Sequence, residues 1–228
     1  MKKYDIFLFD ADGTLYDFDK AEANALKITC ENYGLDYSED ILRLYIEINT
    51  RVWESYNNGK ISRDELQTLR FENFFQAIGV QYDALEFNNN YLYELGKGAF
   101  LIDGALEICE KITSCQKRIY IVTNGILATQ TSRMNHSPIK DYISDFFVSE
   151  FVGSLKPHIS YFEYVFSHIP QFEKDKTLLI GDSLSTDIQG GCNAGIDSCW
   201  FNESLTENRT DITPTYEIQK LCELLKFI

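Results

Sequence analysis

Residues 4–14 read YDIFLFDADGT, an apolar run that ends in two aspartates, a glycine and a threonine. A nearly continuous apolar run suits a strand that is buried on both faces, as in a parallel sheet. We therefore predict a strand over residues 4–9. In a doubly wound sheet, ligands bind just beyond the carboxyl ends of the strands, so Asp10 and Asp12 are placed where chemistry is expected. Taken alone, Asp-Gly-Thr is also an ordinary turn sequence.

Four further short runs have the composition of buried strands. They cover residues 118–122, 146–149, 177–180 and 198–201. From the second run onward, helical patterns separate one run from the next, as parallel βαβ units require. The sequence therefore predicts an α/β fold with a doubly wound, Rossmann-like parallel sheet, formed by residues 1–16 and 98–228.

About 80 residues separate the first two predicted strands, which is too long for an ordinary crossover loop. Within this insertion, Ser38 precedes one amphipathic stretch, and Ser62 with Glu65 forms a capping box before another. Glycines follow the amphipathic stretches, where a left-handed residue would end a helix: Gly34, Gly59, Gly79, and the pair Gly96 and Gly98. We predict four helices, at about 18–34, 38–58, 62–78 and 82–96. They would form a helical cap domain over residues 17–97.

The charge of the chain argues against nucleic acid polymers as partners. Its 228 residues include 21 Lys and Arg against 35 Asp and Glu, a net charge of −14. The cap segment has 8 basic and 15 acidic residues (−7), leaving 13 and 20 (−7) elsewhere, so neither part has the basic excess that gathers phosphates. The sequence shows no signal peptide and no membrane-spanning run. We expect a cytoplasmic protein, and the sequence leaves its oligomeric state open.

Polar residues also follow the other predicted strands. Thr123 and Asn124 follow the second strand, Lys156 lies after the third, and GDSLSTD occupies residues 181–187 after the fourth. Each has an ordinary explanation, such as a strand exit, a solvated lysine or a helix cap. Together they bring carboxylates to one edge of the sheet, where these groups would repel one another unless a cation bound them. Mg²⁺ prefers such oxygen ligands, so we predict a magnesium site.

The ordered set of motifs resembles the haloacid dehalogenase superfamily of aspartyl-phosphate hydrolases. Its four motifs correspond here to DADGT at 10–14, the strand ending in Thr123, Lys156, and GDSLSTD at 181–187. The insertion after the first motif is similar to that superfamily's first type of helical cap. Within the cap, Trp53, Tyr56 and the pair Arg70-Phe71 look similar to the house-cleaning pyrimidine 5′-nucleotidases.

The resemblance implies a role for each motif residue. Asp10 would attack phosphorus and form a phosphoaspartyl intermediate, while Asp12 would protonate the leaving oxygen and then activate water. Mg²⁺ would be held by the side chains of Asp10 and Asp182 and by the backbone carbonyl of Asp12. The expected phosphate ligands are Thr123, Lys156 and the backbone amides of Ala11, Asp12 and Asn124. Asp187 would orient Lys156 or a metal-bound water.

Several other functions are compatible with parts of the pattern. Dehalogenases of this superfamily lack an aspartate at the position of Asp12, so Asp12 favours phosphoryl transfer over halide displacement. A phosphomutase uses the same acids, and the sequence does not separate it from a hydrolase. A signalling receiver is about half as long and carries its phosphoacceptor on a middle strand, and a non-catalytic protein would be expected to lack one motif. We therefore predict an Mg²⁺-dependent phosphatase of nucleoside 5′-monophosphates, with sugar phosphates as the alternative substrates.

Substrate choice is expected to lie in the cap, because such lids close over the phosphate site. Phe18 is our candidate for contact with the substrate, since the first cap segment leaves the active site directly. The aromatic residues Trp53, Tyr56 and Phe71 have helical spacing and are expected to pack in the core of the helix bundle.

Overall fold

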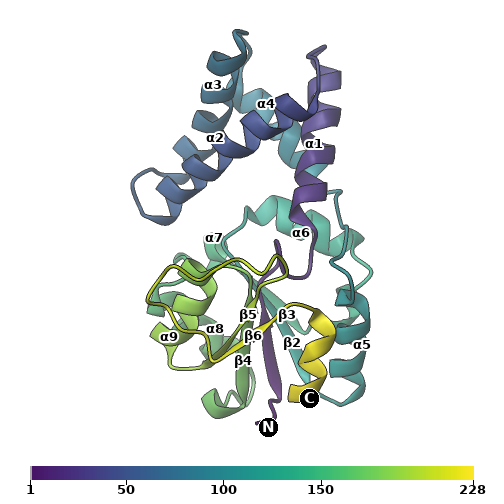
Figure 1. Cartoon of the computed structure of the whole chain (residues 1–228), viewed down its shortest axis with the longest axis vertical. Coiled ribbons are helices and arrows are strands. Elements are labelled where there is room, and N and C mark those ends of the chain that lie inside the picture. Colours follow the sequence, from purple (N-terminus) through teal and green to yellow (C-terminus); the bar gives the residue numbers. More distant parts are fainter. Residues whose placement is uncertain (1) are drawn as a thin grey trace. The chain divides into compact units, whose positions relative to one another are not determined.

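The computed structural model describes residues 2–228, which form two compact units (Figure 1). The core unit comprises residues 2–18 and 99–228, and the cap unit comprises residues 19–98. The predicted boundaries, after residues 16 and 97, lie two residues and one residue before the boundaries of these units. Each unit is described separately below.

A six-stranded, wholly parallel sheet forms the centre of the core unit, with the strand order β3-β2-β1-β4-β5-β6. The strands are β1 (Ile6–Phe9), β2 (Arg118–Thr123), β3 (Asp145–Val148), β4 (Thr177–Gly181), β5 (Asp197–Phe201) and β6 (Tyr216–Ile218). The predicted α/β fold with a doubly wound parallel sheet is thus confirmed. The sequence analysis missed β6, because this three-residue edge strand buries only Ile218 and has no apolar run.

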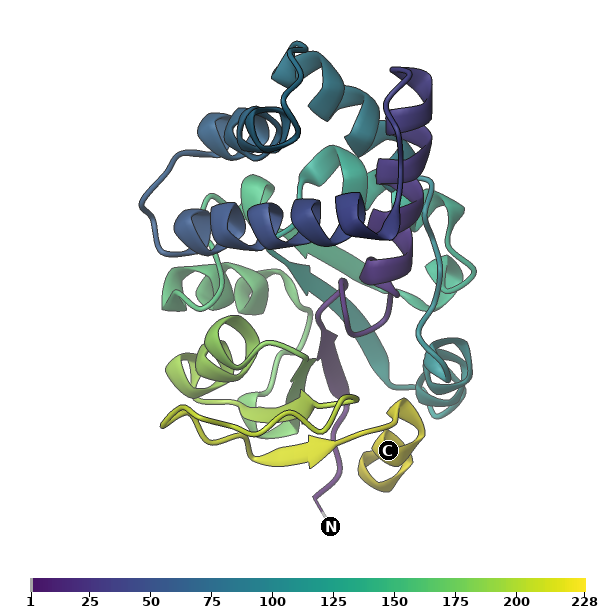
Figure 2. The ribbon, with the colours of Figure 1, turned by 45° about the horizontal axis from the view of Figure 1, so that its top comes forward.

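Alternate residues of the central strands face opposite sides of the sheet, as the period of a strand requires. Phe7 and Phe9 belong to one buried cluster, together with side chains of α5 and of the C-terminal η4. Ile6 and Leu8 belong to a second cluster, which includes α8. Figure 2 shows these elements around the sheet. The core helices and helical turns are α5 (Ala105–Ser114), α6 (Leu127–His136), η1 (Lys140–Tyr142), α7 (Ser149–Val152), α8 (Ile159–His168), η2 (Lys174–Lys176), η3 (Leu184–Ile188), α9 (Gln189–Ala194) and η4 (Leu221–Phe227).

The strand order determines where a ligand can bind. β1 pairs with β2 on one side and with β4 on the other. From β1 the sheet extends to one side through β2 and β3, and from β4 it extends to the other side through β5 and β6, so the direction of strand addition reverses between β1 and β4. Binding sites of doubly wound sheets lie at this switch point, outside the carboxyl ends of the strands. The segments after β1, β2 and β4 therefore meet at one edge.

The cap unit contains the four expected helices: α1 (Phe18–Asn32), whose first residue is grouped with the core unit, α2 (Glu39–Asn57), α3 (Arg63–Ile78) and α4 (Ala84–Leu95). Ser38 caps α2, and Ser62 with Glu65 forms the predicted capping box of α3. Glycines with positive φ follow α1, α2 and α3, as expected: Gly34, Gly59 and Gly79.

Our prediction for Gly96 and Gly98 was wrong, because neither has the left-handed conformation. Gly96 is right-handed, with φ −67°. Gly98 is needed for a close approach instead: a Cβ atom there would lie 2.9 Å from the Cβ of Ala21. The absence of a side chain lets the end of the cap segment pack against α1.

The interior of the cap unit combines aromatic packing with a polar network that draws one residue from each helix. Asn49 donates to Glu22 (2.7 Å), and Arg70 donates through Nε to Asn88 (3.0 Å). Phe71 is fully buried, as expected, whereas Trp53 and Tyr56 are half-buried. Arg70 is therefore a structural residue of the bundle.

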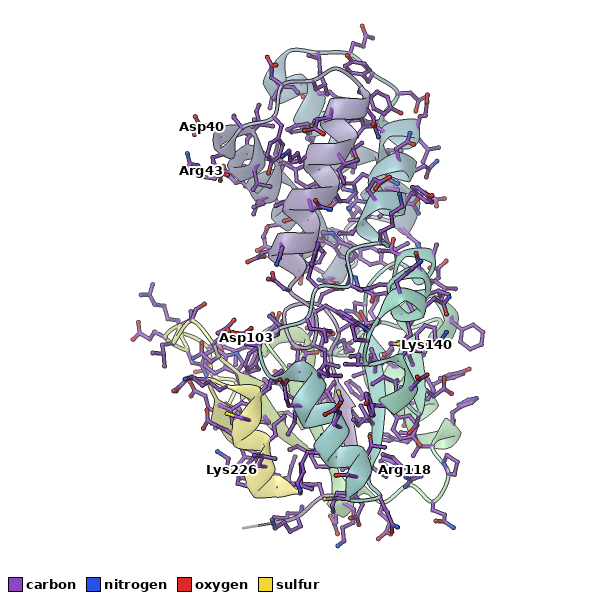
Figure 3. All side chains as sticks on the ribbon, turned by 90° about the vertical axis from the view of Figure 1, so that its right-hand side faces the viewer. Asp40, Arg43, Asp103, Arg118, Lys140 and Lys226 are labelled. Carbon is purple, nitrogen blue, oxygen red and sulfur yellow. The ribbon has the colours of Figure 1, made fainter. Side chains whose placement is uncertain are left out.

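Charged side chains cover the surfaces of both units. Asp40 and Arg43 form a solvent-exposed ion pair on α2, while Arg118, Lys140 and Lys226 lie on three different elements of the core unit (Figure 3). Among residues 2–228, no helix is long and apolar enough to cross a membrane.

Candidate active site

Lys156 links two acidic residues at the carboxyl edge of the sheet. Its Nζ donates to Oδ1 of Asp10 (2.5 Å), Oδ1 of Asp187 (2.7 Å) and the backbone oxygen of Val122 (2.8 Å). These three bonds use all the donors of the ammonium group. Lys156 is 2% exposed and Asp187 1% exposed. The structure thus brings together Asp10, Lys156 and Asp187, which are far apart in the sequence.

Two glycines make room for the carboxylates. Gly13 has φ +79°, and a Cβ atom there would lie 2.8 Å from Oδ2 of Asp182. A Cβ atom on Gly181 would lie 2.3 Å from the carboxyl group of Asp187. The glycines of the first and last motifs are therefore required by the close packing of the acids.

Three carboxylates share this edge with one ammonium group. Oxygen atoms of Asp10, Asp182 and Asp187 all lie within 4.8 Å of one another. Asp187 also accepts a hydrogen bond from the backbone amide of Ser183 (3.1 Å), so both of its oxygens are engaged. Asp10 and Asp182 are the carboxylates best placed to bind a cation, because Asp187 is committed to Lys156 and the loop.

The excess of negative charge shifts the pKa values of the acids and of Lys156. Burial raises the pKa of Asp10 well above its ordinary value, with the charges of Asp187 and Asp182 adding to the effect and Lys156 opposing it. Asp182 is an exposed residue, yet reduced hydration of its carboxyl group and the negative charge of the nearby Asp187 raise its pKa to about 7. Burial alone would lower the pKa of Lys156, but Asp10 and Asp187 outweigh it and raise that pKa. Lys156 therefore stays charged and only partly neutralises the three acids.

Two residues that the sequence analysis gave no role support Asp182. The Thr14 hydroxyl donates to its Oδ1 (3.2 Å), and the Trp200 indole donates to its backbone oxygen (2.8 Å). Thr14 lies within the first motif, but Trp200 lies on β5, where an apolar residue indicates only a buried strand. The contact of Trp200 depends on the pairing of β4 with β5.

The expected phosphate ligands lie at the same edge. Thr123 ends β2, is buried, and accepts a hydrogen bond from the amide of Gly125 (3.0 Å). Asn124 and the backbone of Lys156 exchange two hydrogen bonds, of 2.9 and 2.8 Å, so the Asn124 side chain ties these two loops together. Ala11 is buried in the turn after β1, where its carbonyl accepts from the amides of Leu15 and Tyr16.

Asp12 points to a different set of partners. Gln130 donates to its Oδ2 (2.5 Å), and Arg133 forms an ion pair with its Oδ1. Both partners lie on α6 and were not predicted, since a polar residue within a helical stretch carries no local sign of a contact with another loop. The Asp12 side chain is thus separate from the Asp10, Asp182 and Asp187 cluster.

The sequence matches the haloacid dehalogenase-like hydrolase family over residues 7–201. The chain belongs to this family. It is 42% identical to the HAD-hydrolase YfnB of Bacillus subtilis, over 98% of this chain and 95% of that protein. It is also 36% identical to the pyrimidine 5′-nucleotidase PynA of Streptococcus pneumoniae (97% and 94% covered) and 31% identical to the pyrimidine 5′-nucleotidase YjjG of Escherichia coli (97% and 96%).

A crystal structure of YfnB bound to magnesium superposes with a TM-score of 0.93 at 41% identity, covering 99% of this chain and 98% of the other. The predicted resemblance and the assignment as an enzyme are therefore confirmed: the chain is a hydrolase of this family, and pyrimidine 5′-nucleotidases are among its full-length relatives.

Phe18 of this hydrolase begins α1 and is half-buried. It is grouped with the core unit, not with the cap unit. Its contact with a substrate stays a prediction.

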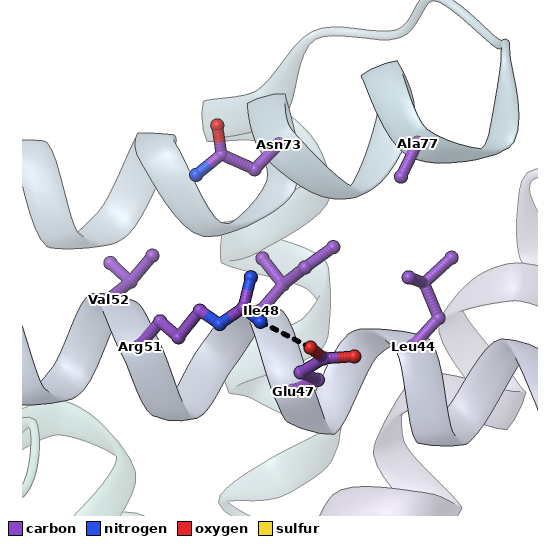
Figure 4. Close-up of a pocket in the computed structure, with 7 residues that line it drawn as sticks. All are labelled: Leu44, Glu47, Ile48, Arg51, Val52, Asn73 and Ala77. Atoms are coloured by element: carbon purple, nitrogen blue, oxygen red, sulfur yellow. Dashed lines mark hydrogen bonds and ion pairs between the residues drawn. The ribbon is translucent and has the colours of Figure 1, made fainter.

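The cap unit also has a groove of its own, between α2 and α3 (Figure 4). It has a volume of about 400 Å³ and is lined by Leu44, Glu47, Ile48, Arg51, Val52, Asn73 and Ala77. Glu47 and Arg51 form an ion pair one helical turn apart. Its lining combines apolar side chains with one ion pair and lacks the acidic cluster of the core unit, so the candidate active site is the edge of the sheet.

Proposed function

We propose that the chain is an Mg²⁺-dependent phosphatase that hydrolyses nucleoside 5′-monophosphates, with a preference for pyrimidine bases. The observation that carries this proposal is the cluster of Asp10, Asp182 and Asp187 around buried Lys156, at the switch point of a hydrolase fold. A nucleophilic carboxylate beside a fixed positive charge suits phosphoryl transfer, in which catalysis is mainly positioning and charge stabilisation.

In the proposed reaction, Asp10 attacks phosphorus, and Asp12 gives a proton to the leaving oxygen as the phosphorus–oxygen bond breaks. Asp12 then takes a proton from water, which attacks phosphorus and releases Asp10 with inorganic phosphate. Lys156, held by Asp187, keeps a positive charge beside Asp10 throughout. Thr123 and the amides of Ala11, Asp12 and Asn124 would bind the phosphoryl oxygens.

The donor set fits Mg²⁺, a hard cation that favours carboxylate and carbonyl oxygens. The side chains of Asp10 and Asp182, with the backbone carbonyl of Asp12, would hold it. The raised pKa values of Asp10 and Asp182 indicate that too little positive charge lies near these two carboxylates. When bound, the ion supplies that charge and stabilises the charge on the transferring phosphoryl group.

We expect Mg²⁺ to stabilise the protein more at pH 8 than at pH 5. Because the folded-state pKa of Asp182 is raised to about 7, its favourable contribution to folding is complete below the unfolded value of 3.8 and is lost as the pH rises through 7. A cation that binds the ionised form reverses that loss. Thermal unfolding with Mg²⁺ or with EDTA, at constant ionic strength, measures the effect.

Asp182→Asn should abolish most of the Mg²⁺-induced increase in Tm and flatten its pH dependence. Asp103→Asn is the matched control, since Asp103 is an exposed carboxylate of the core unit (Figure 3). An equal Mg²⁺ effect at both pH values, or its persistence in Asp182→Asn, would refute this metal site.

The substrate assignment is supported by the two full-length relatives that are pyrimidine 5′-nucleotidases. In the cap unit, Arg70 is fully buried and engaged with Asn49 and Asn88, so it is not available to bind a second phosphate. A monophosphate is therefore favoured, and the two relatives point to a pyrimidine, which is a flat, neutral base. Such a base can stack on an aromatic side chain, for which Phe18 is our candidate.

We predict that dUMP and dTMP have higher kcat/KM than glucose or glycerol phosphates, measured by release of inorganic phosphate. Stacking is worth about 1–3 kcal/mol per base, which corresponds to roughly 5- to 150-fold in selectivity. Phe18→Ala should reduce the difference, whereas Tyr93→Ala, which removes an exposed ring of α4, should not. If kcat/KM were about tenfold higher for a sugar phosphate than for these nucleotides, only the general phosphatase assignment would remain.

A further inference from the structure

Helix α6 provides Asp12 with two side-chain donors that the reaction described above does not use. Gln130 Nε2 donates to Oδ2 of Asp12 at 2.5 Å, and Arg133 Nη1 donates to Oδ1. We propose that Gln130 and Arg133 are positioning residues that hold the Asp12 carboxylate and select the oxygen that exchanges a proton with the substrate. This inference rests on the proposed function, in which Asp12 is the general acid and base. We call the pair the Asp12 clamp.

The clamp is built into the core unit. Its two residues are three positions apart on α6, so they lie on the same face of the helix, and they are 5% and 0% exposed. The ring of Tyr16, in the turn after Asp12, lies 5.3 Å from the guanidinium carbon of Arg133. A Cβ atom on Gly125 would lie 2.4 Å from Nε2 of Gln130, so a side chain there would displace the amide from Asp12.

The two donors differ in how readily they can release Asp12. Arg133 is always charged and fully buried, and its Nε and Nη2 have no hydrogen-bond partner. Asp12 is its ion-pair partner, so leaving Asp12 would place an unpaired charge in the interior. Gln130 is neutral, so weakening its hydrogen bond to Asp12 leaves no unpaired charge on the donor side and is less costly. Arg133 therefore anchors Oδ1, while Oδ2 accepts from Gln130 through one lone pair and keeps its second lone pair for the proton that it exchanges with the substrate.

This assignment gives each oxygen of Asp12 a defined part in the reaction. In the first step, the proton on Oδ2 passes to the ester oxygen as its bond to phosphorus breaks and the Asp10–phosphorus bond forms. In the second step, Oδ2 takes a proton from water as the water oxygen binds phosphorus and the Asp10–phosphorus bond breaks. The sum is ester plus water giving alcohol plus phosphate, and Arg133 stays on Oδ1 throughout.

The clamp is tested with leaving groups that differ in their need for a proton. Rapid-quench experiments with Mg²⁺ would measure phosphoenzyme formation from benzyl phosphate, whose alkoxide must be protonated, and from p-nitrophenyl phosphate, whose leaving group departs without a proton. The variants are Gln130→Met, which keeps the length but removes the donor, and Arg133→Lys, which keeps the charge. We expect each to slow the benzyl reaction about tenfold or more and the nitrophenyl reaction about twofold or less.

A double-mutant cycle distinguishes positioning from a structural role. On the Asp12→Asn background, Gln130→Met and Arg133→Lys should change the benzyl rate by about twofold or less, because the residue through which they act is already lost. Asn135→Ala is the control, since Asn135 is exposed on α6 and contacts Lys140 rather than Asp12. Thermal unfolding would establish that each variant folds, and if Arg133→Lys does not, Gln130→Met decides the result.

Two outcomes overturn the clamp while leaving the proposed function intact. One is equal slowing of both substrates, or the same slowing on the Asp12→Asn background, which indicates a structural role. The other is a slow Asp12→Asn enzyme with clamp variants at the wild-type rate. By contrast, an Asp12→Asn enzyme with the wild-type rate on benzyl phosphate would refute the general-acid role within the proposed function itself.

Discussion

Asp10→Asn should lower kcat for phosphomonoesters by about 10³-fold or more. Asparagine keeps the volume of the side chain but removes the attacking charge and one metal ligand. Lys156 would keep its bonds to Asp187 and to the Val122 carbonyl, so the surrounding loops should stay in place. Because burial raises the pKa of Asp10, the ionised carboxylate costs folding energy at neutral pH, and its removal should not lower Tm substantially.

The measurement is phosphate release at saturating substrate, together with trapping of the phosphoenzyme in the acid-quenched protein. Asp5→Asn is the matched control, since Asp5 is an exposed carboxylate just before β1 that pairs with Lys117. It should keep nearly full activity. If Asp10→Asn retained more than about a few per cent of wild-type turnover, covalent catalysis by Asp10 would be excluded.

Lys156→Met should have the largest effect on stability, with a loss of about 3–5 kcal/mol. Methionine fills similar space but leaves the buried carboxylates of Asp10 and Asp187 without their shared cation. For a chain of this size, each kcal/mol shifts Tm by about 2–4 °C. Turnover should fall as well, because the charge beside the nucleophile is lost.

Chemical denaturation at pH 8 with EDTA would measure the loss without a contribution from metal. Lys176→Met, at a lysine whose side chain is 47% exposed, is the control and should change stability little. Adding Asp187→Asn to Lys156→Met should restore part of the stability, since one unpaired carboxylate is removed. A Lys156→Met variant as stable as the wild type would mean that Lys156 does not neutralise the two acids.

The candidate site was predictable where its residues follow apolar strands. Asp10, Thr123 and Asp182 each come at or directly after the end of a run that reads as a buried strand, and such ends meet at one edge of a parallel sheet. The helical cap was predictable for a similar reason, because Ser38, Ser62 and Glu65 cap helices through contacts with their near neighbours. In both cases the pattern involves only residues that are close together in the sequence.

Other features left no local pattern. Gly96 follows a helix, as Gly79 does, yet only Gly79 is left-handed. The chain after Gly96 instead brings Gly98 close to Ala21. β6 pairs with β5 through backbone hydrogen bonds that require no apolar side chain, so its three residues did not stand out.

The sequence by itself determined which polar groups follow the strands, namely acids, a threonine and a lysine, and that a mainly helical segment of about 80 residues is inserted after the first motif. Only the tertiary structure decided how those groups are held. Lys156 meets Asp10 across 146 positions, and Arg133 meets Asp12 across 121. Such contacts depend on strand order and on the close packing that glycines 125 and 181 allow. Sequence periodicity reports the environment of a residue along its own helix or strand, whereas its partner on another element is determined by how the elements pack.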